Sequence, residues 1–226
     1  KEEAKEAFAR LSSAEWTGPS TALVGEAILN LFEVMGVRPD AVASHSFGDI
    51  AALRAAGVLD GEAILKMARF RGELGVACHQ AVRGCILIAN EGAAKIKSLL
   101  AQNNIAHVWV ANCNSHGQTT LSGVKERIEQ AHKMLRRQRI ASRLIPITGA
   151  PHCPLSYNVA EEFYSYLQEI PFRKADCDVY SFLFGRKVGN DPDIFRKMLK
   201  VHCEKPVRFA QQIECMYRDG VRTFIE

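Results

Sequence analysis

Residues 83–148 constrain the fold most, because strand and helix patterns follow one another there in a recognisable order. The segments predict strand, helix, strand, strand, helix and strand in turn: RGCILIAN, GAAKIKSLLAQNN, HVWVANCNS, QTTLSGV, KERIEQAHKMLRRQ and SRLIPI. A β-α-β-β-α-β order is the split βαβ, ferredoxin-like arrangement, which is compact enough to form a unit on its own. We therefore expect a small subdomain at 83–148, inserted into a larger one.

The flanking residues, 1–82 and 149–226, predict the larger subdomain as an α/β unit with parallel strand pairing. The apolar run at 41–44 suits a buried strand, and 48–56 predicts a helix stopped by Gly57. Later segments predict helices at 155–170, 193–204 and 206–220, and strands at 178–185 and 221–226.

Two helices between residues 20 and 81 complete this picture. Apolar residues recur at helical spacing in the first and predict a buried face: Val24, Ala27, Ile28, Leu31, Phe32 and Met35. Asp60 stands where it can cap the second helix.

Composition excludes several classes of function. A chain of 226 residues that is 47% hydrophobic can bury a real core, but it contains no apolar run of about 18 residues that could cross a membrane. The net charge is +4, and the densest basic run is KMLRRQR at 133–139. This run is either a solvated helix face or a docking patch for an acidic partner. Because no aromatic residues interleave with it, we do not expect nucleic-acid binding.

The seven cysteines are odd in number and scattered, without a CxxC pair. This pattern favours free thiols in a reducing cytoplasm. His202 and Cys203 are adjacent, but no second pair stands at ligand spacing, so we expect no metal site.

The stretch SHSFG, residues 44–48, raises the first question of chemistry. In a nucleophile elbow the serine stands on a tight strand-to-helix turn, and small residues must flank it at two positions before and after. Ser44 and Gly48 satisfy that size rule around Ser46. The alternative is a serine that only caps a helix.

A nucleophilic serine needs a base within hydrogen-bond reach. His152, in the Gly/Pro-rich segment TGAPHCPL, is the best-placed histidine, since loops of this kind bring catalytic groups to strand ends. The alternative is an ordinary surface histidine.

Four stretches together resemble malonyl-CoA:acyl carrier protein transacylases and the acyltransferase domains of polyketide and polyunsaturated fatty acid synthases. They occur in the family's order and span nearly the whole chain: ASHSFGDIAALRAAGVLDGEAILKMARFRGEL, NCNSHGQTTLSG, GAPHCPL and KPVRFAQQIECMYRDGVRTFIE. The resemblance implies an α/β-hydrolase-like large subdomain with a parallel sheet and an inserted ferredoxin-like small subdomain.

The resemblance also implies a role for each site residue. Ser46 would attack the thioester of an acyl-CoA, and His152 would act as its general base. A backbone carbonyl at Lys205 would orient the histidine, and the backbone N–H of Phe47 would donate to the oxyanion. Arg71 matches the family's arginine that grips the free carboxylate of malonyl-type units, through two parallel charge-assisted hydrogen bonds.

The sequence departs from the family in three places. A Gly-Gln-Gly loop, which supplies the second oxyanion donor in the family, does not occur in residues 1–226, so we expect a piece of a longer polypeptide. Gly18 stands where a glutamine is common. Pro151 stands before the histidine, where the family commonly has Phe or Ser. Pro151 and His45 are the expected pocket and selectivity residues, and the choice between malonyl and methylmalonyl stays open.

The function implied is transfer of a malonyl-type group from CoA to the phosphopantetheine thiol of an acyl carrier protein, in polyketide or fatty acid synthesis. The expected partners are acyl-CoA, the carrier protein and neighbouring synthase domains, with no bound cofactor. Two alternatives remain: an acyl hydrolase of the same fold, which should lack Arg71, and a non-catalytic module that docks a carrier protein.

Overall fold

The computed structural model describes residues 2–11, 13–81, 84–145 and 149–225. The helices of this part are α1 (Glu2–Leu11), α2 (Ala14–Val34), α3 (Gly48–Ala55), α4 (Gly61–Ala81), α5 (Ala93–Gln102), α6 (Lys125–Arg137), the 3-10 helix η1 (Pro154–Val159), α7 (Ala160–Leu167), α8 (Pro192–Val201) and α9 (Phe209–Arg218). The strands are β1 (Ala41–Val42), β2 (Gly84–Ala89), β3 (Val108–Ser115), β4 (Gln118–Val124), β5 (Ser142–Ile145), β6 (Asp178–Ser181) and β7 (Arg186–Lys187). Among the described residues, no helix has both the length and the apolar character of a membrane span.

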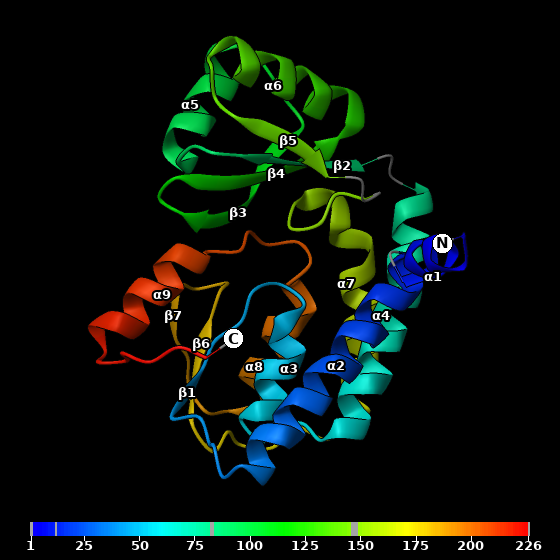
Figure 1. The fold of residues 1–226 in the computed structure, drawn as a ribbon, viewed down its shortest axis with the longest axis vertical. Helices are drawn as coiled ribbons and strands as arrows, with labels where there is room; N and C mark the ends of the chain where they lie inside the picture. Colours follow the sequence, from blue (N-terminus) through cyan, green and yellow to red (C-terminus); the bar gives the residue numbers. More distant parts are fainter. Residues whose placement is uncertain (1, 12, 82–83, 146–148, 226) are drawn as a thin grey trace.

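The four-stranded sheet has the order β3-β4-β2-β5 and is antiparallel throughout. Its strands alternate with α5 and α6 in the expected β-α-β-β-α-β order, so that prediction is confirmed. Figure 1 shows this sheet and its two helices as the upper part of the molecule. Leu87 and Leu121 from the sheet, with Ile96 and Ile128 from the helices, are fully buried between the two layers. The expected limits of this subdomain stay a prediction, because residues 82–83 and 146–148 lie outside the described ranges.

The larger part is built around the sheet β1-β6-β7. β1 and β6 pair in parallel, as expected, whereas β6 and β7 form an antiparallel hairpin that the sequence did not indicate. The segment expected as one helix at 155–170 is a 3-10 helix followed by α7, which ends at Leu167, and the strand expected at 178–185 ends at Ser181. The expected strand at 221–226 is wrong for the residues described, since 221–225 form neither helix nor strand.

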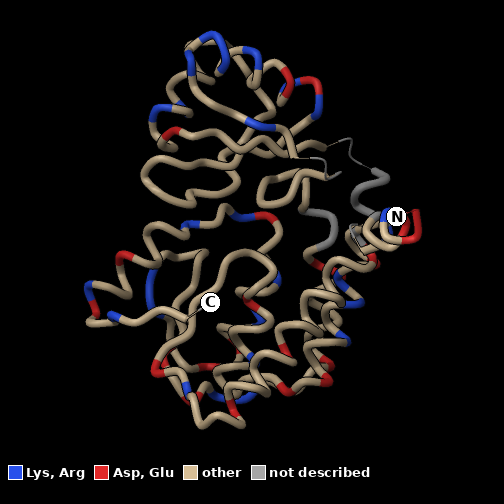
Figure 2. Tube along the Cα trace, viewed as in Figure 1, with Lys and Arg blue, Asp and Glu red and all other residues tan. Residues whose placement is uncertain are grey.

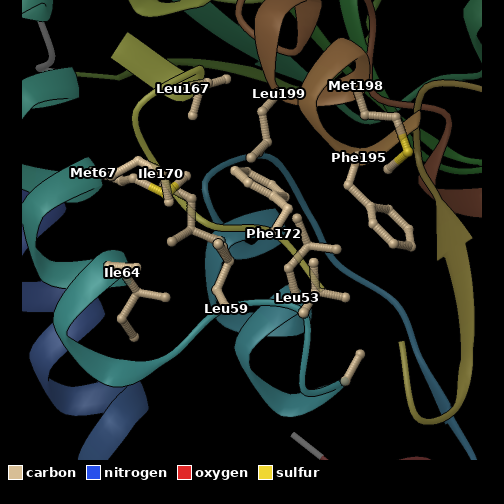
Figure 3. Close-up of a cluster of buried hydrophobic side chains, with 14 of the residues drawn as sticks. Leu53, Leu59, Ile64, Met67, Leu167, Ile170, Phe172, Phe195, Met198 and Leu199 are labelled. Carbon is tan, nitrogen blue, oxygen red and sulfur yellow. The ribbon is translucent and has the colours of Figure 1, made fainter. Parts of the chain in front are cut away.

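Beneath this sheet, side chains from α3, α4, α7 and α8 form one apolar core (Figure 3). Leu53, Ile64, Phe195 and Leu199 all belong to this core and are fully buried. Gly57 ends the α3 segment with φ of 74°, and Asp60 Oδ1 accepts a hydrogen bond from the Ala63 N–H at 2.9 Å, as predicted. The helix that carries the elbow is therefore fixed by a well-packed base.

The predicted buried face of α2 is wrong. Val24, Ile28 and Met35 lie largely exposed, whereas Ala22 is buried. The reason is a stripe of small residues, Gly18, Ala22 and Gly25, one turn apart on a different face of the helix. A Cβ at Gly18 would lie 3.2 Å from the Ala68 carbonyl oxygen, so α2 approaches α4 through its small residues rather than its large ones.

The basic run at 133–139 is exposed on α6 and the turn after it, which is consistent with both interpretations that the sequence allows. Lys133, Arg136, Arg137 and Arg139 are exposed, while Met134 and Leu135 point into the core. Figure 2 shows basic residues, in blue, along the outer helices of the upper part.

Candidate active site

Ser46 lies on a sharp turn between β1 and α3. Its φ is 57°, in the left-handed region that L residues rarely adopt. The turn brings its flanks together, since a Cβ at Gly48 would lie 3.5 Å from the Ser44 Cβ. A side chain longer than alanine at residue 48 would therefore press against that strand end. A serine held in this strained conformation between small flanking residues has the geometry of a nucleophile elbow.

His152 reaches Ser46 from a segment more than one hundred residues away in sequence. The Ser46 Oγ and His152 Nε2 lie 2.6 Å apart. On the other side of the ring, His152 Nδ1 lies 3.1 Å from the Lys205 carbonyl oxygen. Because a carbonyl only accepts, Nδ1 carries the proton and Nε2 is left to accept from the serine hydroxyl. The arrangement is a serine–histidine pair oriented by a backbone carbonyl.

The imidazole is held in its neutral form. Burial, followed by the nearby positive charge of Arg71, lowers the pKa of His152 from 6.5 to about 4. The side chain is buried, and its backbone N–H donates to the Cys203 carbonyl at 2.6 Å. At neutral pH the ring is therefore an unprotonated base beside a hydroxyl, as general-base activation requires.

The backbone amide of Phe47 directly follows Ser46 at the start of α3. Phe47 is the N-cap residue of α3, and its N–H has no acceptor within the described part of the chain. The next amides are engaged, since Gly48 N–H donates to the His45 carbonyl and Asp49 N–H to the Ser46 carbonyl. A free N–H at a helix start, one residue after the nucleophile, can stabilise developing negative charge.

Arg71 projects from α4 toward the same place. Its Cζ lies 4.8 Å from the centre of the Phe47 ring, and its Nε donates to the Cys203 Sγ at 3.4 Å. No carboxylate in the described ranges lies within ion-pair distance of this half-buried guanidinium. A guanidinium beside a serine–histidine pair, without an anionic partner, is suited to a substrate carboxylate.

His45 connects the elbow to the small subdomain. Its Nε2 lies 2.9 Å from Asn114 Oδ1 and 3.2 Å from Asn112 Nδ2, both on β3. The ring also packs edge-on against Phe209 at 5.3 Å. His45 is exposed, and Pro151 is half-buried directly before His152. Both expected pocket residues therefore lie at the rim of the site.

The structure thus brings together the three predicted side chains Ser46, His152 and Arg71, with the Phe47 amide and the Lys205 carbonyl. It adds Asn112 and Asn114, which sequence reasoning placed only in a resembling segment. It also adds Cys203, which drew notice only as a neighbour of His202. In the parts of the chain described, no cluster of acidic, histidine and cysteine side chains could hold a metal ion.

A family model for the acyl transferase domain matches residues 4–226. The chain belongs to the acyl transferase domain family. This acyltransferase domain is 31% identical over 215 residues to the malonyl CoA-acyl carrier protein transacylase of Bacillus subtilis, a match that covers 92% of this chain and 67% of that protein. It is 30% identical over 226 residues to a polyunsaturated fatty acid synthase polypeptide of Thraustochytrium sp., covering 96% of this chain but 8% of the synthase.

The fold agrees with these relatives. The malonyl CoA-acyl carrier protein transacylase of Coxiella burnetii superimposes with a TM-score of 0.87 at 27% identity, covering 94% of this chain and 68% of that one. The expected class, an α/β-hydrolase-like part with a ferredoxin-like part, is therefore confirmed. The acyltransferase domain spans about two thirds of the transacylases and a small part of the synthase.

Proposed function

We propose that this acyltransferase domain moves a malonyl-type group from CoA to the phosphopantetheine thiol of an acyl carrier protein, through an acyl-enzyme on Ser46. The observation that carries the proposal is the 2.6 Å contact between Ser46 Oγ and His152 Nε2, with the Arg71 guanidinium beside it. The similarity to a malonyl CoA-acyl carrier protein transacylase supports the same donor and acceptor.

In the first half-reaction the Ser46 Oγ attacks the thioester carbonyl while His152 Nε2 takes the hydroxyl proton. The Phe47 N–H faces the oxyanion of the tetrahedral intermediate. The C–S bond then breaks, and the CoA sulfur leaves with the proton from His152. The free carboxylate of the acyl group pairs with Arg71, which fixes the carbonyl against the serine.

The second half-reaction reverses these steps with a different thiol. His152 takes the proton of the phosphopantetheine thiol, and the sulfur attacks the ester carbonyl on Ser46. The ester bond breaks, and Ser46 Oγ recovers its proton from His152. Ping-pong kinetics follow, because CoA leaves before the carrier protein thiol reacts.

A cytoplasmic location is part of the proposal, since acyl-CoA and carrier proteins are intracellular. It is supported by the cysteines whose side chains the structure describes, none of which forms a disulfide.

The test is intact-mass spectrometry after incubation with malonyl-, methylmalonyl- and acetyl-CoA. We expect one malonyl-type adduct on the parent protein and none on Ser46→Ala. Ser122→Ala is the matched control, because Ser122 is a buried serine on β4 whose hydroxyl has no partner in the described residues. An adduct retained by Ser46→Ala would remove Ser46 from the nucleophile role. Rapid loss of the adduct to water without a carrier protein would favour the hydrolase alternative.

A further inference from the structure

Two buried titratable side chains lie behind the serine–histidine pair, and the mechanism above does not use them. His202 Nδ1 and Asp49 Oδ2 are 4.0 Å apart, and the two side chains are 0% and 3% exposed. Neither ring nitrogen of His202, nor Asp49 Oδ2, has a hydrogen-bond partner among the described residues. Each buried polar atom without a partner costs about 1–3 kcal/mol. An apolar pair of the same size would fill this space at lower cost, so the pair calls for a reason beyond packing.

Asp49 is fastened to the nucleophile elbow. It lies in the first turn of α3, and its N–H donates to the Ser46 carbonyl at 3.1 Å. Its Oδ1 accepts a hydrogen bond from the Ser44 hydroxyl. Asp49 is therefore bonded to the nucleophile residue itself and to the residue two before it, and a shift of Asp49 moves the turn that carries Ser46.

His202 begins the segment that holds the general base. It follows the end of α8, and its ring packs 6.0 Å from the ring of Phe163 on α7. Within the next three residues, the Cys203 and Lys205 carbonyls accept the two N–H groups of His152, from its backbone and its Nδ1. A shift of His202 therefore moves the carbonyls that orient the imidazole.

We propose that Asp49 and His202 are positioning residues. Their carboxyl and imidazole share one proton, and they hold Ser46 and His152 at hydrogen-bonding distance from each other. The inference rests on the proposed serine–histidine chemistry. The two atoms are 4.0 Å apart in this structure, beyond hydrogen-bond distance, so they must move closer to share the proton.

The charges around the pair support a single shared proton. Burial, offset by the Ser44 hydroxyl and Arg71, raises the pKa of Asp49 to about 7. Burial, followed by the charges of Arg71 and His152, lowers the pKa of His202 well below 6.5. Arg71 from α4 and His152 from its loop are thus the titratable groups that face the pair, and Phe163 from α7 is the apolar one. A proton held between Asp49 and His202 avoids two opposite charges in a dry site.

The test uses one serine-labelling reagent and one substrate, so that failure of this inference can be told apart from failure of the proposed function. A fluorophosphonate reports how well His152 activates Ser46, without the need for acyl-CoA. Ser46 Oγ bonds to phosphorus, fluoride leaves, and His152 takes the proton. Malonyl-CoA reports the proposed reaction. Rates with both are measured from about pH 5 to about pH 9, a range that spans the ordinary histidine pKa, for Asp49→Asn, His202→Leu, the double variant and His202→Gln.

We expect each single variant to label about 10- to 100-fold more slowly, the cost of misplacing a reacting group by about 1 Å. Half-saturating concentrations should change less than about twofold, because neither residue touches the substrate. The double variant should be no slower than the slower single variant, since one interaction is lost. His202→Gln, which keeps a neutral N–H donor, should recover most of the rate. The control is Gln212→Leu, which removes a buried amide bonded to the Tyr180 carbonyl and should lower stability while labelling at the parent rate.

Additive losses in the double variant would overturn the inference, as would single variants that label at the parent rate. Loss of rate in His202→Gln equal to that in His202→Leu would overturn it too, because packing alone would then explain His202. If the parent reacts with the fluorophosphonate but not with malonyl-CoA, the proposed function is wrong. The labelling rates of the variants then still test the positioning role of Asp49 and His202.

Discussion

Replacement of Arg71 by methionine isolates the charge that the site offers to a substrate. Methionine keeps an unbranched apolar stem against the Phe47 ring, which the Arg71 Cζ approaches to 4.8 Å. It removes the guanidinium and with it both donors for a carboxylate. The prediction is a loss of malonyl transfer with little effect on acetyl transfer, because only the malonyl group carries a second carboxylate.

The size of the loss follows from desolvation. A malonyl carboxylate beside the half-buried Arg71 would be left without a partner, and truncating one side of such a pair costs about 2–5 kcal/mol. At about 1.4 kcal/mol per factor of ten, kcat/KM for malonyl-CoA should fall roughly 30- to several thousand-fold. The contact with Phe47 exists without substrate, so its loss affects the stability of the protein more than the rate with either substrate. Discrimination between the two should therefore nearly vanish.

The assay compares kcat/KM for malonyl-CoA and acetyl-CoA, measured as CoA release with a fixed acyl carrier protein. Arg69→Met is the control, since Arg69 lies on the same helix but points to solvent and pairs with Glu73 at 3.0 Å. It should leave both rates unchanged. If Arg71→Met slowed both substrates by the same factor, or neither, the carboxylate would not bind at Arg71.

The remaining predictions concern the base and the loop that carries it. Because the charge of Arg71 helps to lower the pKa of His152 to about 4, Arg71→Met should raise it toward 6.5. His152 acts when neutral, so the acid limb of fluorophosphonate labelling should move to higher pH, and an unmoved limb would contradict the electrostatic account. Gly84→Ala would place a Cβ 2.6 Å from the Ala150 N, just before Pro151 and His152. It should destabilise by about 1–3 kcal/mol in urea unfolding and slow labelling. Gly117→Ala, where a Cβ meets nothing within 4 Å, should do neither.

The site could be predicted because its residues sit in short motifs with strong local signals. The small flanks of Ser46 and the Gly/Pro context of His152 are visible in sequence, and the resemblance supplied Arg71 and the Lys205 carbonyl. Asp49 and His202 gave no such signal. An acidic residue in a first helical turn is ordinary. The adjacent histidine and cysteine raised only the question of a metal site, which their spacing did not support. Their meeting depends on how α3 and α8 pack, which spacing does not encode.

The small subdomain was also predictable, because each strand and helix there has a matching local period. The face of α2 was not. Periodicity marks where large apolar residues gather, but helix approach is decided by the residues that allow contact, here Gly18, Ala22 and Gly25. A run such as 221–226 carries strand-forming residues, yet a strand exists only where a neighbour pairs with it, and the described part of that run has none.

The most direct test of the account is to locate the acyl group by fragmentation mass spectrometry of peptides after brief incubation with malonyl-CoA. We expect a malonyl ester on Ser46, and a much slower appearance of that ester in His152→Ala. A malonyl group on another residue, or equal rates with and without the imidazole, would contradict it.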